Sequence, residues 1–170
     1  MAWEKIAAEE ISGNLIERIG RQWFLLTAGT DKDWNAMTCS WGRAGVLWNH
    51  PAVTGYVRRS RHTLSFMEKQ ETFTLSFFPE IERKALAYCG THSGRDGNKT
   101  AEAGLHPELI AGDAVTFKEA EMVLVCRKRF AADIDPKNLP QEIITGFYSG
   151  DAAHRMYIGE ILGVYVASDD

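Results

Sequence analysis

Residues 157–166 read Tyr-Ile-Gly-Glu-Ile-Leu-Gly-Val-Tyr-Val, and this alternating run fits the pleat of a β-strand better than one face of a helix. The segment Thr72-Phe-Thr-Leu-Ser-Phe-Phe78 has the same character. Strands are therefore expected at 155–167 and 72–78. Further apolar runs of strand length lie at 23–28, 35–41, 52–58 and 121–134. The chain is rich in strands.

Helices are expected to be few and short. We predict them at 14–20, 63–70 and 81–89, with another that begins near Asn98 or Lys99 and ends at Gly104. Residues 29–33 read as a hairpin turn. A doubly wound sheet would need longer helices alternating with the strands. The prediction is therefore a mainly β protein, a largely antiparallel β-barrel with short α-helices, in which residues 1–170 form a single domain.

The composition is that of an ordinary globular protein. The 170 residues are 45% hydrophobic and 25% charged, and the formal net charge of −4 argues against nucleic acid as a partner. No apolar stretch approaches the ~18 residues that cross a membrane, and Glu9 and Glu10 argue against a signal peptide. The 3 cysteines are odd in number and widely separated, so we expect reduced thiols and a cytoplasmic protein.

The sequence Arg58-Arg-Ser-Arg-His-Thr63 concentrates guanidinium and hydroxyl groups between a predicted strand and a predicted helix. Guanidinium groups bind phosphate through paired, charge-assisted hydrogen bonds, and the start of a helix offers free backbone N–H groups. The cluster is therefore a candidate phosphate site. The alternative is a solvated basic edge, which is what charge clusters usually are.

The sequence Met37-Thr-Cys-Ser-Trp-Gly42 is a second candidate. Thr38 and Ser40 would share one face of a strand, beside an indole that can pack on a planar ring. A half-buried strand with polar residues turned outward is the simpler alternative. His154, at the start of the last strand, is a candidate donor or proton relay, although a lone histidine is more often structural.

A third candidate is the loop Gly90-Thr-His-Ser-Gly-Arg-Asp-Gly-Asn-Lys99. Its three glycines, with Ser93 and Lys99, can form a backbone nest for an anion, or the loop can be an ordinary surface loop. It does not have the spacing of a P-loop.

Other familiar chemistries lack their patterns. Gly42-Arg-Ala-Gly45 is too short for a dinucleotide-binding Gly-x-Gly-x-x-Gly motif, so a dinucleotide would not be held in the dehydrogenase manner. The chain contains no Gly-x-Ser-x-Gly and no His-Glu-x-x-His sequence. Its 5 histidines are not spaced like ligands on one helix or strand, and no metal site is predicted.

The order of these segments is more specific than any one of them. From about Trp23 to Val166, the chain resembles the flavin reductase-like family of FMN-binding split-barrel proteins, which includes flavoredoxins. The Met-Thr-x-Ser-Trp sequence at 37–41 and the Arg-x-Ser-Arg-x-Thr sequence at 58–63 carry most of the resemblance. The N-terminal 20 residues and the stretches 106–120 and 135–150 add little.

The resemblance implies a split-barrel homodimer with one FMN per subunit, bound near the subunit interface, and NADH or NADPH as the electron donor. His154 should lie on the exposed side of the flavin, where the nicotinamide approaches, and is the candidate catalytic residue. The cofactor-binding residues carried over by position are Met37, Thr38, Cys39, Ser40 and Trp41 near the ring and ribityl chain, Arg58, Ser60, Arg61 and Thr63 at the phosphate, with Val57 beside them, and Ser93 and Lys99, which close the anion site.

The sequence leaves several functions open. The first is an NAD(P)H-dependent flavin reductase. The second is a non-catalytic FMN electron carrier, which would exchange electrons with a redox partner protein and would not use NAD(P)H. A barrel that binds pyridoxal phosphate or haem, and a barrel without any cofactor, are two further alternatives.

Overall fold

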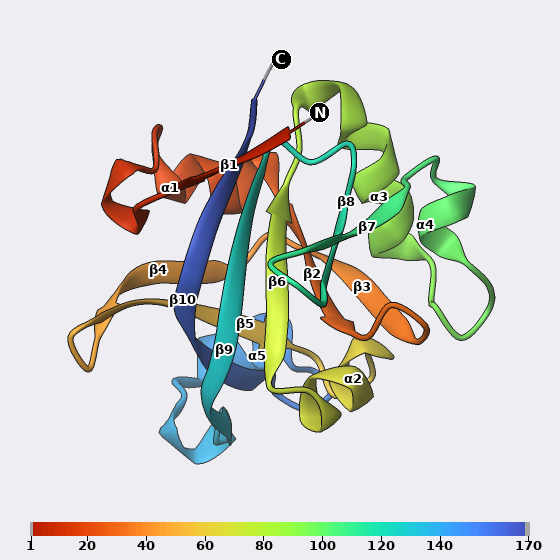
Figure 1. Cartoon of the computed structure of the whole chain (residues 1–170). Helices are drawn as coiled ribbons and strands as arrows, with labels where there is room; N and C mark the ends of the chain where they lie inside the picture. The colour runs from red at the N-terminus through yellow and green to blue at the C-terminus, as the bar shows by residue number, and fades with distance from the viewer. Residues whose placement is uncertain (1, 169–170) are drawn as a thin grey trace.

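The computed structural model describes residues 2–168 and is dominated by an eight-stranded antiparallel sheet (Figure 1). The main hydrogen-bonded path runs β3-β2-β6-β9-β10-β5-β4, and β1 pairs with β10 beside this path. A separate hairpin is formed by β7 and β8. The strands are β1 (Ala2–Ile6), β2 (Phe24–Gly29), β3 (Trp34–Cys39), β4 (Gly42–Leu47), β5 (His50–Val57), β6 (Thr72–Phe77), β7 (Pro107–Ile110), β8 (Ala114–Phe117), β9 (Met122–Asp133) and β10 (Arg155–Ser168).

The two ends of this path are joined in sequence by only Ser40 and Trp41. The chain leaves its pairing with β2 at Cys39 and enters its pairing with β5 at Gly42, so the sheet curls back on itself at this bend. A Cβ atom at Gly42 would lie 3.3 Å from the Thr54 carbonyl oxygen, so a glycine helps the strands to approach closely here. The predicted fold class, a mainly β barrel with short helices, is confirmed.

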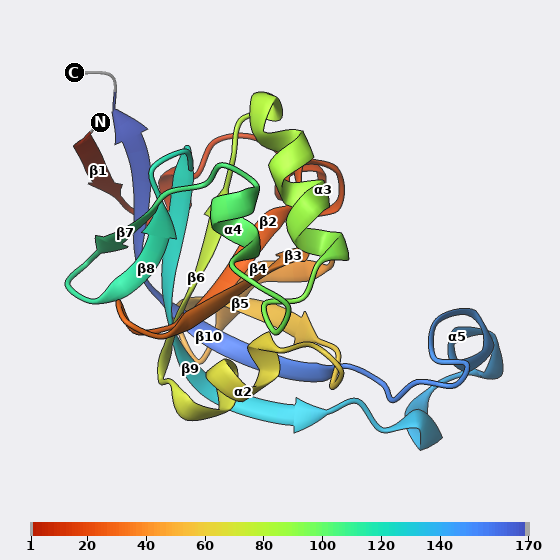
Figure 2. The same cartoon turned by 90° about the vertical axis from the view of Figure 1, so that its right-hand side faces the viewer.

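The sheet buries both of its faces. Phe24 and Leu26 of β2 pack inside the barrel, whereas Leu25 packs on the opposite face. On that face, α3 (Arg83–Thr91) and the β7–β8 hairpin cover the sheet (Figure 2). Because both faces are buried, β2 reads as a continuous apolar run and not as an alternating one.

The helices are short, as predicted. They are α1 (Leu15–Glu17), which continues as a π-turn over Arg18–Gln22, α2 (Thr63–Lys69), α3, α4 (Lys99–Glu102) and α5 (Gln141–Phe147), with 3₁₀ turns at Ala8–Glu10, Glu80–Glu82 and Pro136–Asn138. The sequence did not predict β1, β4, β7, β8 or α5. Within residues 2–168, no helix is long and apolar enough to cross a membrane.

The α5 segment stands apart from the rest of the barrel. It joins β9 to β10 and projects beyond the ends of these two strands (Figure 2). None of its seven residues is fully buried. The segment leads directly to His154, so it lies next to the candidate site.

Candidate ligand-binding site

Two cavities meet at Met37 and Arg61 and form one groove. The first has a volume of about 210 Å³ and is here called the aromatic end. The second, of about 300 Å³, is called the cationic end. The aromatic end is lined by Met37, Thr38, Cys39, Ser40, Trp41, Tyr56, Arg58, Arg61 and His154. The cationic end is lined by Asn35, Met37, Ser60, Arg61, His62, Thr63, Gly90, Thr91, His92, Ser93, Gly94, Arg95 and Lys99.

Three cations of the cationic end have no anionic partner among residues 2–168. Lys99 is only 5% exposed, and its ammonium group donates to the Cys89 and His92 carbonyls at 3.2 and 3.1 Å. In the described residues, the Arg61 guanidinium reaches only the Gly90 carbonyl, at 3.4 Å, and Arg95 donates to the Ser60 carbonyl at 3.0 Å. In the part of the chain that the structure describes, none of these cations forms an ion pair with a carboxylate.

The electrostatics of Lys99 follow from this arrangement. Its burial, and to a smaller extent the charge of Arg61, lower the pKa of its ammonium group. A buried charge without a counter-ion is costly, typically several kcal/mol. An anion bound at the cationic end would offset this cost.

Buried hydrogen bonds fix the walls of the cationic end. The Asn35 amide of β3 donates to the Thr63 hydroxyl of α2 at 2.7 Å, and both side chains are buried. The Ser93 hydroxyl accepts the Arg95 backbone N–H at 3.2 Å and shapes the following turn. Gly94 lies against Asn35 so closely that a Cβ atom would clash with the amide oxygen. Strand, helix and loop thus hold the cavity from three sides.

His154 lines the aromatic end and is surrounded by aromatic side chains. It is 6% exposed and lies among the rings of Trp41, Tyr56 and Tyr148, with ring centroids 5.3, 6.4 and 5.5 Å away. Its Nδ1 atom is 2.7 Å from the Tyr148 hydroxyl oxygen. Burial, followed by the charge of Arg58, lowers the pKa of His154 to about 4. The imidazole is therefore neutral at neutral pH.

Other residues of the first motif are engaged with the protein. The Thr38 hydroxyl donates to the Leu86 carbonyl at 2.6 Å and so ties β3 to α3. Cys39 is 6% exposed, and burial raises the pKa of its thiol to about 12. A thiol with such a pKa is not a nucleophile at neutral pH. Trp41, by contrast, is 44% exposed and presents its indole to the groove.

A larger apolar cavity of about 740 Å³ adjoins the aromatic end and shares Ser40, Trp41, Tyr56 and His154 with it. One wall comes from the N-terminal helical region and the other from the segment before and within α5. The additional lining residues are Leu15, Ile16, Ile19, Gly20, Gly42, Arg43, Ala44, Ile134, Leu139, Ile143 and Tyr148. This cavity could not be predicted, because most of its lining residues lie outside the recognised motifs.

The sequence model described as "Flavin reductase like domain" matches residues 16–170. The chain belongs to this family. No match was found among curated protein sequences.

Solved structures of flavin reductase-like proteins share the fold. A flavoredoxin from Methanosarcina acetivorans is 22% identical with a TM-score of 0.69, over 95% of this chain and 77% of that one. An FMN-binding domain of a flavin reductases-like enzyme from Shewanella baltica OS155 is 16% identical with a TM-score of 0.68, over 97% and 77%. An NADH:FAD oxidoreductase from Streptomyces globisporus C-1027 is 16% identical with a TM-score of 0.64, over 86% and 75%.

In this flavin reductase-like domain, the three neighbouring arginines point in different directions. Arg58 lies at the aromatic end, where it donates to Asp151 at 3.3 Å and to the Phe147 carbonyl at 3.2 Å. Arg59 donates to both carboxylate oxygens of Asp133, at 2.9 and 3.0 Å. Only Arg61 of the three lines the cationic end. Arg58, predicted to bind the phosphate, lies at the aromatic end in this structure, and its guanidinium holds the α5 segment.

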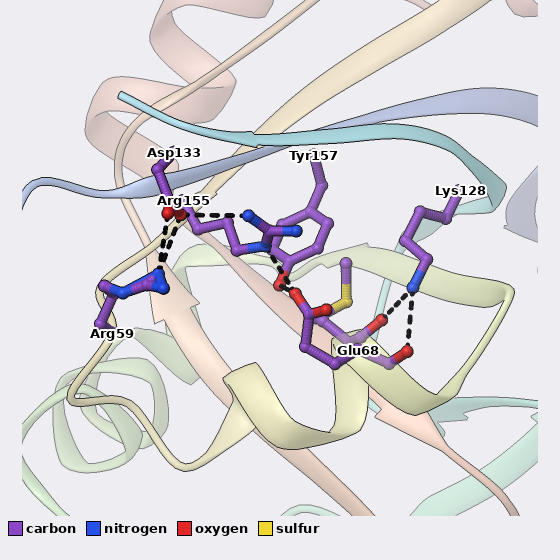
Figure 3. Close-up of polar contacts among 7 residues, drawn as sticks. Arg59, Glu68, Lys128, Asp133, Arg155 and Tyr157 are labelled. Carbon is purple, nitrogen blue, oxygen red and sulfur yellow. Dashed lines mark hydrogen bonds and ion pairs between the residues drawn. The ribbon is translucent and has the colours of Figure 1, made fainter. Parts of the chain in front are cut away.

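Arg59 belongs to a polar network that fixes the loop 58–62 and α2 to the barrel (Figure 3). Asp133 also accepts from Arg155 at 3.1 Å, and Arg155 donates to Glu68 of α2 at 2.6 Å. The buried Tyr157 donates to the same Glu68 at 2.5 Å, and these hydrogen bonds lower the pKa of Glu68. At the end of α2, Lys128 donates to the Met67 and Glu68 carbonyls, at 2.6 and 3.3 Å.

The remaining predicted residues fall as follows. Ser60, Thr63, Ser93 and Lys99 line the cationic end with Arg61, as expected of an anion site. Val57 is fully buried in the barrel core and lines neither end of the groove.

Sequence reasoning missed several lining residues. Asn35 could have been found, since it alternates with Met37 on β3 and so shares its face. Arg95 lay inside the glycine-rich loop but was not selected. Tyr56 belongs to the segment of the arginine cluster but was not among the predicted binding residues, and Tyr148 lies in a stretch without a motif.

Proposed function

We propose that this domain binds FMN along the groove, with the phosphate at the cationic end and the isoalloxazine ring at the aromatic end. The observation that carries the proposal is the buried ammonium of Lys99, with Arg61 and Arg95 beside it and no carboxylate in the described residues to neutralise them. A phosphomonoester supplies up to two negative charges. Each hydrogen bond to a charged group contributes about 1.5–3 kcal/mol, so three cationic donors fit the phosphate.

The aromatic end fits a planar ring. Trp41 offers an exposed flat face, and Tyr56 and His154 add further aromatic surface. Seryl and arginyl side chains at this end can hydrogen-bond the polar edge of the ring system. The chemical character of the groove thus changes from cationic to aromatic along its length, as the parts of FMN do.

We further propose that the protein is an NAD(P)H-dependent flavin reductase. Bound FMN supplies the hydride-accepting ring. The adjoining apolar cavity would hold the nicotinamide against this ring and exclude water, and no carboxylate of residues 2–168 lines it to repel an anionic donor. Neutral His154, between ring and cavity, would give or accept a hydrogen bond without carrying charge. The match to an NADH:FAD oxidoreductase fold supports the proposal.

The visible spectrum of the protein tests both steps. Purified or FMN-reconstituted protein should show a bound-flavin spectrum, and anaerobic NADH or NADPH should bleach it. Bleaching by dithionite but by neither nicotinamide would favour the electron carrier, a function that the flavoredoxin neighbours support. A protein that binds no FMN would contradict the proposal altogether.

We also propose a homodimer. Val46 and Trp48 of the β4–β5 hairpin are 78% and 56% exposed, and Trp41 is 44% exposed at the groove. Val46 and Trp48 are close together at the tip of this hairpin, and exposed apolar side chains that lie together are typical of protein interfaces. The chain has a mass of 19.0 kDa, and sedimentation equilibrium should give twice this value. A monomer at micromolar concentration would contradict this.

A further inference from the structure

The segment 139–151 is attached to the barrel by a few contacts, and these gather around His154. Phe147 packs edge-on against Trp41, with ring centroids 5.4 Å apart. Arg58 holds Asp151 and the Phe147 carbonyl, and its guanidinium lies 5.6 Å from the centre of the Tyr148 ring. Tyr148 then reaches His154 through its hydroxyl. The segment therefore places one polar group, the Tyr148 hydroxyl, beside His154, whose other neighbours here are aromatic rings.

The two nitrogens of His154 have different surroundings. Nδ1 is 2.7 Å from the Tyr148 hydroxyl oxygen, whereas Nε2 has no hydrogen-bond partner among residues 2–168. Among residues 2–168, Thr27 Oγ1 is the only fully buried side-chain nitrogen or oxygen atom without a hydrogen-bond partner. Nε2 of His154 also lacks a partner, so it must be at least partly accessible. It therefore opens into the space that His154 lines, the aromatic end and the apolar cavity.

We propose that Tyr148 is a positioning residue that selects the tautomer of His154. Nδ1 is the only acceptor for the Tyr148 hydroxyl proton among residues 2–168, so in this proposal the hydroxyl donates to Nδ1 and the single proton of the neutral ring resides on Nε2, facing the groove. His154 then presents a fixed N–H donor to the ligand, in one orientation. The ion pair of Arg58 with Asp151 acts one step further back, because it holds the segment that carries Tyr148.

This inference rests on the proposed function for its catalytic consequence, but not for its structural content. A hydrogen bond from a phenol to a bare imidazole nitrogen determines which ring nitrogen carries the proton. A donor of fixed direction can align a nicotinamide or the flavin edge, and lining residues that only fill space cannot.

The decisive experiment is ¹⁵N NMR of histidine-labelled protein without ligand at pH 7, in which long-range ¹⁵N–¹H correlations distinguish the two neutral tautomers. Wild-type His154 should show a single tautomer with the proton on Nε2. Tyr148→Phe should give a mixture or the opposite tautomer. Tyr165→Phe is the matched control, because the Tyr165 hydroxyl makes no hydrogen bond in the described residues and lines none of these cavities. A wild-type proton on Nδ1, or unchanged His154 signals in Tyr148→Phe, would overturn the inference.

Kinetics and binding provide the second readout. In Tyr148→Phe, FMN affinity should stay within about twofold, while flavin reduction by the nicotinamide slows about 2- to 10-fold, as one neutral hydrogen bond would give. Asp151→Asn should show a weaker change in the same direction, and it tests the segment without altering Tyr148. An equal loss of FMN binding in both variants would indicate a merely structural role. If the wild-type protein binds no FMN, the proposed function fails while the NMR result still decides the tautomer.

Discussion

Lys99→Met is the sharpest test of where the phosphate binds. The substitution keeps an unbranched side chain of similar length but removes a charge that is 95% buried and unpaired in the described chain. If the FMN phosphate is the missing counter-ion, the variant loses one charge-assisted hydrogen bond. Such a bond contributes about 1.5–3 kcal/mol, which corresponds to an increase in Kd of about 10- to 150-fold.

Riboflavin separates this effect from general damage, because it has the same ring and ribityl chain but no phosphate. Apoprotein is titrated with FMN and with riboflavin, and the quenching of flavin fluorescence gives each Kd. Riboflavin affinity should change by less than about twofold in Lys99→Met. Lys118→Met is the control, since Lys118 is an exposed lysine at the end of β8 and its loss changes the net charge equally.

Two results would refute the reasoning. Equal weakening of FMN and riboflavin would mean that Lys99 supports the groove as a whole and does not contact the phosphate. Unchanged FMN affinity would place the phosphate elsewhere. Urea unfolding of both apoproteins shows whether the variant is folded, because the substitution also removes the donor to the Cys89 and His92 carbonyls.

Three further outcomes follow from the geometry. The pKa of His154 is about 4 in the folded protein and 6.5 in the unfolded protein. Between these pH values the unfolded state binds more protons, so the contribution of His154 to stability is complete above pH 6.5 and is lost as the pH drops towards 4. The loss is at most about 3 kcal/mol, and urea unfolding against His154→Gln measures it. Gly94→Ala should weaken FMN binding and cost about 1–3 kcal/mol, since its Cβ clashes with Asn35, whereas Gly45→Ala meets open space and should do neither. Cys39 should react with a thiol reagent at pH 8 only in unfolded protein, and rapid native labelling would contradict its burial.

The sequence was sufficient for elements whose pattern is local. The strands β2, β5, β6, β9 and β10 could be predicted because their apolar runs are long or alternate, and α2 because it follows a strand and a polar turn. By contrast, β4 contains two glycines and is largely exposed, so its sequence carries little strand signal. The strands β7 and β8 have only four residues each, too few for a period to be recognised.

The candidate site shows the same division. We predicted that the motif around Met37 and the cluster around Arg61 line one ligand site. Their placement along one groove is consistent with this prediction. Which of the three clustered arginines faces the anion was not predictable. Arg58 and Arg59 are neutralised by carboxylates that lie 93 and 74 residues further along the chain. No pattern around residue 58 refers to those positions, so only the folded structure distinguishes the paired guanidinium groups from Arg61, which has no carboxylate partner among residues 2–168.

This pairing explains how a protein of net charge −4 can present a selective anion site. The long-range field of the chain is weakly unfavourable to a phosphate, and salt screens it within about 10 Å. Selectivity must therefore arise locally, from cations that are dry and unpaired. Asp151 and Asp133 neutralise Arg58 and Arg59, so in the described part of the chain the guanidinium of Arg61 and the ammonium of Lys99 remain as the buried or half-buried positive charges facing one cavity. Removal of the Asp133 carboxylate would leave Arg59 without its partner but would not bring Arg59 into the groove. Removal of the Lys99 ammonium deletes a charge from the groove itself. Lys99 is therefore the informative position to change.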